Sequence, residues 1–196
     1  MPTSRTWGGT TLTDRKAARR AQLIEAGIDL LGAEAGPSMS VRALCRHAKL
    51  TERYFYESFT DRDDVVLAVY EHVGQAARQA LIDAVEASSP EPEQRARAAV
   101  TAFVELIIDD PRKGRVLLLA PLSDPALSSR GVELLPAFAA LIREQLPPGA
   151  AEADRDMTAI GLVGALANLF IAYLGGLLEV SREHLIDHCV RLLARA

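Results

Sequence analysis

Two short apolar patterns separated by a tight turn constrain this chain more than any other feature. Residues 40–59 read SVRALCRHAKLTERYFYESF. The first half carries apolar residues at spacings of three and four, which lie on one face of a helix: Val41, Leu44, Cys45 and Ala48. Ser40 is a suitable N-cap for this helix, and Lys49 and Leu50 follow it as a short turn. Thr51 can cap a second short helix.

The second helix holds four of the ten aromatic residues of the chain, Tyr54, Phe55, Tyr56 and Phe59. Phe55 and Phe59 are four residues apart, so they share a face that can point inward, while Arg53 and both tyrosines can point outward. In a helix-turn-helix, the second helix enters the DNA major groove and presents such side chains to bases and phosphates. The alternative is that all four aromatic rings simply pack the short helices together.

The rest of the chain shows helical periodicity interrupted by proline and glycine, and no strand-like alternation. Acidic residues follow the aromatic stretch; Thr60 with Asp63 predicts a capping box at the start of a long helix. A metal site is the alternative use of these acids, but they lack the spacing of a calcium loop. The predicted all-α fold contains these helical blocks: 14–35, 40–48, 51–58, 60–85, 92–109, 112–119, 128–146, 152–178 and 182–195.

Charge is distributed unevenly along the chain. Residues 1–56 hold nine Lys/Arg against five Asp/Glu, a net charge of +4, whereas the whole chain carries −4. A basic N-terminal part on an acidic body indicates an anionic partner at one end. Arg5, Arg15, Lys16, Arg19 and Arg20 lie in or next to an N-terminal arm, which could follow a DNA duplex or be a solvated tail.

Residues 40–73 resemble the DNA-binding segment of TetR-type bacterial transcriptional regulators. The resemblance rests on a Ser-Val-Arg start, an Ala-x-Leu-Thr turn, an aromatic second helix, a Tyr-x-x-Phe pair and a following Arg-Asp. The matching residues are Val41, Arg42, Ala48, Leu50, Thr51, Phe55, Tyr56, Phe59, Arg62 and Asp63. The family usually has glycine where this chain has Lys49, and a side chain in the left-handed conformation costs about 1 kcal/mol.

This resemblance implies an all-α fold with a helix-turn-helix domain at residues 14–60, after a flexible arm at 1–13, and a helical effector-binding and dimerisation domain at 61–196. It implies phosphate contacts by Thr51, Tyr56 and Arg62, and base contacts by Arg53 and Tyr54. Arg42 would hold a phosphate or an acidic neighbour, and Lys49 would add a phosphate contact. The implied partner is a double-stranded, (pseudo)palindromic operator, bound by a homodimer that acts as a repressor.

The C-terminal part is expected to supply the dimer interface and the effector pocket. Residues 152–178 are apolar nearly all round, so they need partners on several sides, one of which can be a second subunit. Together with residues 181–196 they would form a four-helix interface, as the resemblance implies. A small, mainly apolar effector would be recognised by Phe103, Phe138, Asn168, Phe170 and Tyr173.

Other classes of function find less support in the sequence. No glycine-rich phosphate loop or nucleophile elbow is present, so we expect no enzyme and no cofactor. His184 and His188 have metal-ligand spacing but lack a third ligand, so we expect no metal. Cys45 and Cys189 predict reduced, buried thiols of a cytoplasmic protein without a membrane span. A helical interaction or scaffold module that does not bind DNA is the remaining alternative.

Overall fold

The computed structural model describes residues 12–34, 39–128, 130–146 and 151–195. Within these ranges every regular element is helical, which confirms the predicted all-α fold. The elements are α1 (Leu12–Leu31), α2 (Val41–His47), α3 (Glu52–Tyr56), α4 (Arg62–Ala87), α5 (Pro92–Ile107), α6 (Pro111–Gly114), the π-helical turn η1 (Arg115–Leu119), α7 (Ala120–Ser123), the 3-10 turn η2 (Pro125–Leu127), α8 (Arg130–Arg143), α9 (Glu152–Leu174) and α10 (Arg182–Ala194).

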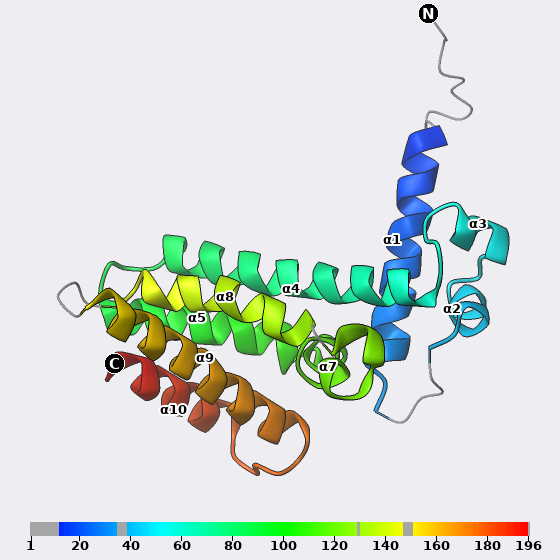
Figure 1. Ribbon diagram of the computed structural model, residues 1–196. Coiled ribbons are helices and arrows are strands. Elements are labelled where there is room, and N and C mark those ends of the chain that lie inside the picture. The colour runs from blue at the N-terminus through cyan, green and yellow to red at the C-terminus, as the bar shows by residue number, and fades with distance from the viewer. Residues whose placement is uncertain (1–11, 35–38, 129, 147–150, 196) are drawn as a thin grey trace, which may run out of the picture.

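The helices form a small N-terminal unit and a longer body (Figure 1). Helix α1 stands steeply against the long axis of α4, and α2 and α3 lie beside α1 at one end of the molecule. Helices α4, α5 and α8 run along the body, and α9 and α10 lie along one of its edges. The face of α3 that points away from α1 is therefore at the extreme end of the molecule, far from the C-terminus.

The N-terminal unit is held together by side chains that are fully buried. Leu23 and Ile28 of α1, Leu44 of α2 and Phe55 of α3 each have a relative exposure of 0%. Burying a side chain of this size contributes about 1.5–3 kcal/mol, so these residues help to hold α2 and α3 against α1. The Ser40 side chain accepts a hydrogen bond from the Ala43 backbone N–H (3.2 Å), which confirms its predicted N-cap role.

Helix α4 joins the N-terminal unit to the body through one continuous core. Val65, Val66, Val69 and Val73 are buried along its first three turns and belong to the same cluster as Leu44, Phe55 and residues of α5 and α10. Helix α4 is thus in direct packing contact with both units.

The cap of α4 differs from the prediction by one residue. Asp61, and not Thr60, is the N-cap; its carboxylate accepts from the Asp64 backbone N–H (2.9 Å). The Asp64 carboxylate in turn accepts from the backbone N–H of Thr60 (2.8 Å). Both Thr60 and Asp61 are residue types that favour the N-cap, so sequence alone could not choose between them.

Several other boundaries also differ from the expected blocks. Helix α1 begins at Leu12, while residues 1–11 of the predicted arm lie outside the described part of the chain. The block 112–119 is not one α-helix but the short α6 followed by η1. The block 152–178 ends at Leu174, where Gly175 forms the C-cap and Gly176 adopts a positive φ of 71°.

Candidate functional site

The aromatic side chains of α3, together with Phe59 just after it, divide into a buried and an exposed set, as predicted. Phe55 and Phe59 are 0% and 4% exposed, whereas Tyr54 and Tyr56 are 36% and 59% exposed. The Phe55 ring contacts the Phe59 ring at a centroid distance of 5.7 Å and meets the Tyr56 ring edge-on at 5.2 Å. The buried rings thus fix the helix, and both tyrosine hydroxyls remain available at the surface.

Arg53 and Arg42 are cations whose side chains are largely exposed on this surface. The Arg53 side chain is 86% exposed, and its Nε lies 3.7 Å from a Glu57 carboxylate oxygen. Arg42, 88% exposed, lies 3.5 Å from Glu52. Exposed ion pairs of this kind contribute about 0–1 kcal/mol, so either arginine can exchange its carboxylate for a phosphate or a base edge at small cost.

The turn before α3 contains a left-handed residue at the position where the family that this segment resembles usually has glycine. Lys49 has φ 53°, and the described part of the chain contains no other non-glycine residue with a positive φ. The turn is closed by the Leu50 N–H, which donates to the Cys45 carbonyl (2.9 Å). Lys49 itself is exposed. Thr51 is the N-cap of α3 but makes no side-chain capping bond, so its hydroxyl is not committed to the helix.

Arg19 of α1 orients α3, a role that the sequence did not reveal. Its guanidinium lies 4.3 Å from the centre of the Tyr54 ring and donates to a Glu57 carboxylate oxygen at 3.1 Å. Only 23% of this side chain is exposed. The sequence placed Arg19 among the cations of the N-terminal arm, because nothing local indicates a partner thirty-eight residues away.

The guanidinium of Arg62 contacts other parts of the chain and does not belong to the exposed surface of α3. Its guanidinium donates to the Met39 carbonyl (3.0 Å), to Asp63 (2.8 Å) and, through both terminal nitrogens, to Asp124 between α7 and η2. Asp124 is 9% exposed. The hydrogen bonds from Arg62 hold the pKa of Asp124 below its usual value despite burial, and the same pairing raises the pKa of Arg62. Arg62 thus links the start of α2, the start of α4 and the body.

A second polar contact joins α1 to the body. Arg112 of α6 donates to Asp29 and, at 3.4 Å, to Glu25, both on α1. Burial acts to raise the pKa of Asp29, but hydrogen bonds from His47 and Arg112 outweigh it and keep that pKa below its usual value. At Gly32, an added Cβ would lie 2.4 Å from the Arg112 carbonyl oxygen, so the end of α1 and α6 can approach this closely only with glycine there.

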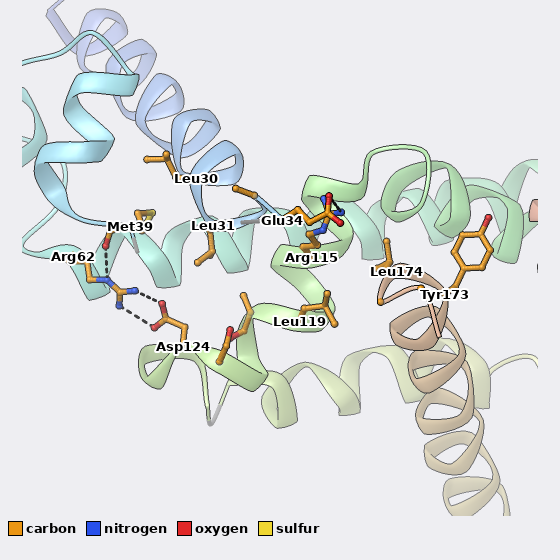
Figure 2. Close-up of a pocket in the computed structure, with 15 residues that line it drawn as sticks. Leu30, Leu31, Glu34, Met39, Arg62, Arg115, Leu119, Asp124, Tyr173 and Leu174 are labelled. Atoms are coloured by element: carbon orange, nitrogen blue, oxygen red, sulfur yellow. Dashed lines mark hydrogen bonds and ion pairs between the residues drawn. The ribbon is translucent and has the colours of Figure 1, made fainter. Parts of the chain in front are cut away.

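These contacts border a cleft between the N-terminal unit and the body, with a volume of about 630 Å³ (Figure 2). Its charged groups form two pairs, Arg62 with Asp124 and Arg115 with Glu34. In Figure 2 the first pair lies at one end, the second lies near the middle, and Tyr173 lies at the opposite end. The apolar walls come from the end of α1, the π-helical turn and the end of α9: Leu30, Leu31, Leu119 and Leu174.

The five predicted effector-recognition residues do not gather in one place. Phe103 contacts Phe170 and Phe138 at centroid distances of 5.2 and 6.1 Å, so these rings pack against one another in the body. The Asn168 amide is exposed and donates to the Gly164 carbonyl of its own helix (2.8 Å). Tyr173 alone among the five lines the cleft. The assignment of all five to an effector stays a prediction.

Helix α9 leaves much of its apolar surface uncovered within one chain. Met157 and Ile160 are 64% and 57% exposed, and a Cβ added at Gly161 or Gly164 would meet nothing within 4 Å. By length and composition α9 could span a membrane, but one such helix is weak support because core helices of soluble proteins share these properties. A single chain therefore leaves part of this helix exposed and does not supply the partners on every side that its apolar sequence predicts.

The histidines and cysteines of the described ranges do not gather into a metal-binding cluster. No group of three or more His, Cys, Asp or Glu side chains could hold a metal there. His188 is exposed on α10. Cys45 and Cys189 are free and buried, as predicted, and burial raises the pKa of the Cys189 thiol to about 11.

Comparison with solved structures shows likeness along nearly the whole chain. A TetR-like transcriptional regulator from Rhodococcus sp. RHA1 is 21% identical (TM-score 0.68; 91% of this chain and 95% of that chain covered). The fatty acid degradation regulator FadR from Bacillus halodurans is 15% identical (TM-score 0.76; 89% and 94%). FadR from Bacillus subtilis, solved with stearoyl-CoA, is 16% identical (TM-score 0.73; 88% and 96%). No protein-family model and no curated protein matches the sequence.

Proposed function

We propose that this chain, which has the fold of the TetR-family transcriptional regulators, is a cytoplasmic, non-enzymatic DNA-binding regulator. The observation that carries the proposal is the exposed surface formed by α3, the turn before it and the start of α2. This surface presents basic and hydroxyl-bearing side chains at the end of the molecule: Arg42, Lys49, Thr51, Arg53, Tyr54 and Tyr56. Groups of this chemistry contact phosphates and base edges when a recognition helix enters the major groove.

Within this surface the residues have different proposed roles. Arg53 would reach a guanine edge, because its side chain is long, lies on the recognition helix and is 86% exposed, with only a 3.7 Å contact to Glu57. Tyr54 would reach bases beside it, while Thr51, Tyr56, Arg42 and Lys49 would hold phosphates. Arg62 is left out of the proposed interface, because its guanidinium donors are already directed to Met39, Asp63 and Asp124.

We further propose that the protein is a homodimer that acts as a repressor on a (pseudo)palindromic operator. The exposed apolar face of α9, around Met157 and Ile160, supports an isologous interface with a second copy. Helix α10 would complete it, since a two-helix patch on each subunit forms a four-helix interface. Such a dimer places two α3 helices on successive major grooves, which a monomer cannot do.

A small, mainly apolar effector is proposed to release the DNA. Support comes from the leucine-lined cleft between the DNA-binding unit and the body, and from stearoyl-CoA bound to the FadR structure of the same fold. Release requires that the ligand bind more tightly to an arrangement of the two α3 helices that no longer matches one turn of duplex.

The decisive experiment selects bound duplexes from a random pool with the full chain and then measures affinities for the selected site. We expect Arg53→Ala to weaken binding by about 1–3 kcal/mol and to relax selectivity at one position of each half-site. Tyr56→Phe, which removes only a hydroxyl, should weaken all duplexes alike. Failure to enrich any duplex at low salt would favour the alternative, a helical interaction module without DNA binding.

A further inference from the structure

Arg115 is the cation of the cleft between the N-terminal unit and the body that has no close carboxylate partner. Its side chain is only 20% exposed, yet its contacts are long: 3.4 Å to the Gly32 carbonyl and 3.6 Å to the Glu34 carboxylate. Glu34 is itself 86% exposed and therefore well solvated. Arg62, at one end of the same cleft, instead has a nearly buried carboxylate in a two-point contact. Arg115 thus borders the cleft with only long contacts, so a carboxylate that came closer than Glu34 would form a stronger, charge-assisted hydrogen-bonded pair with it.

The surroundings of Arg115 indicate what else that partner carries. Leu30 and Leu31 from the end of α1, Leu119 from the same π-helical turn, and Leu174 and Tyr173 from the end of α9 line the cleft around it. The volume of about 630 Å³ lies in the range of small-molecule sites. π-Helical turns are rare and occur frequently at functional sites; here the turn begins at Arg115 and ends at Leu119.

We propose that this cleft binds a small amphipathic carboxylate, with its head on Arg115 and its apolar chain along the leucine walls. The carboxylate would accept two hydrogen bonds from the Arg115 fork, and Glu34, being solvated, would turn away into water. Asp124 does not oppose an anion here, because Arg62 and the Ala126 N–H already compensate its charge. The site thus adds a charged head to the small, mainly apolar effector predicted from the sequence.

Such a ligand would touch the two units at once. It contacts the end of α1, which carries the DNA-binding unit, and the end of α9, which carries the proposed dimer face. Binding would therefore alter how α1 sits on the body. The regulatory part of the inference, that the carboxylate weakens DNA binding, rests on the proposed function; the binding site itself does not.

The test is calorimetric titration of the full chain with octanoate and, as a neutral probe of similar shape, 1-octanol. We expect octanoate to bind about tenfold to a hundredfold more tightly than octanol, because a hydrogen-bonded charge pair distinguishes them. Arg115→Gln should bring the two affinities together, and Arg115→Lys should retain part of the preference. Arg130→Gln, at an exposed arginine paired with Glu133 outside the cleft, is the matched control and should bind like the parent. Circular dichroism checks that each variant is folded.

Equal binding of octanoate and octanol by the parent chain would overturn the site, whatever the variants do. So would an unchanged preference in folded Arg115→Gln. If octanoate binds through Arg115 but leaves affinity for a selected duplex unchanged, the regulatory role is wrong. If no duplex is selected at all while the calorimetric pattern holds, the proposed function fails and the carboxylate site stands.

Discussion

The pairing of Arg62 with Asp124 provides a sharp test of how the two units are joined. We consider Asp124→Asn and, as a matched control, Asp63→Asn: both substitutions remove a carboxylate from the same arginine. The Asp124 side chain is 9% exposed and that of Asp63 is 64% exposed. Removing one partner of a buried ion pair costs about 3–5 kcal/mol, whereas an exposed pair contributes about 0–1 kcal/mol.

We expect Asp124→Asn to cost less than the upper end of the range of about 3–5 kcal/mol for a broken buried ion pair. Arg62 is 32% exposed and keeps its contacts to Met39 and Asp63, so part of its charge stays compensated. The new amide oxygen can still accept from the Ala126 N–H (3.1 Å). We therefore expect a loss of about 2–3 kcal/mol in the free energy of unfolding for Asp124→Asn. For Asp63→Asn we expect less than about 1 kcal/mol.

The pH dependence separates the charge effect from a packing effect. Because Arg62 lowers the pKa of Asp124 in the folded state, the stabilisation is fully present above the unfolded carboxyl pKa of about 3.9 and is lost as pH falls through the folded value. The parent and Asp124→Asn should therefore converge in stability at acid pH. Urea unfolding at fixed protein concentration, followed by circular dichroism from pH 7 down to pH 3, measures this.

Two results would refute the reasoning. The first is equal destabilisation by Asp124→Asn and Asp63→Asn at neutral pH, which would show that the nearly buried pair is no stronger than the exposed one. The second is a difference between parent and Asp124→Asn that stays constant with pH, since that would assign the loss to altered packing.

Further variants test the other features. Phe55→Ala should cost about 3–5 kcal/mol in urea unfolding, because the ring is fully buried; retention of parental stability would contradict the assigned core. Lys49→Gly should stabilise the fold by about 1 kcal/mol by relieving the positive φ, yet reduce the salt dependence of DNA binding by about one unit per subunit. Ile160→Glu should yield a monomer in light scattering, whereas Leu122→Glu, at a position on α7 that is even more exposed (72% against 57%), should not; a dimer in both would move the interface elsewhere. Gly32→Ala should destabilise by about 1–3 kcal/mol, because its Cβ would meet backbone that cannot yield, and a melting curve unchanged from the parent would show that α1 can shift freely.

Local periodicity by itself determined the helical class and the division of the α3 aromatics. Side chains three and four residues apart share a helix face wherever the helix lies, so Phe55 and Phe59 could be assigned inward and Tyr56 outward. The left-handed conformation of Lys49 did not follow from periodicity; it was indicated by the resemblance, because the family usually has glycine at this position of the turn. The start of α4 was missed by one residue, because Thr60 and Asp61 are both competent caps and their competition depends on geometry.

Only the tertiary structure decided which groups face one another across long stretches of chain. Arg62 resembles a phosphate contact in sequence but pairs with Asp124, sixty-two residues away, because folding brings the α7–η2 junction against the start of α4. Arg19, Arg112 and Arg115 likewise acquire their partners from distant elements. The apolar α9 predicted a partner on every side, but one chain covers only part of it. Pairings of this kind depend on how helices are placed in space, and a repeat along a single helix carries no information about that placement.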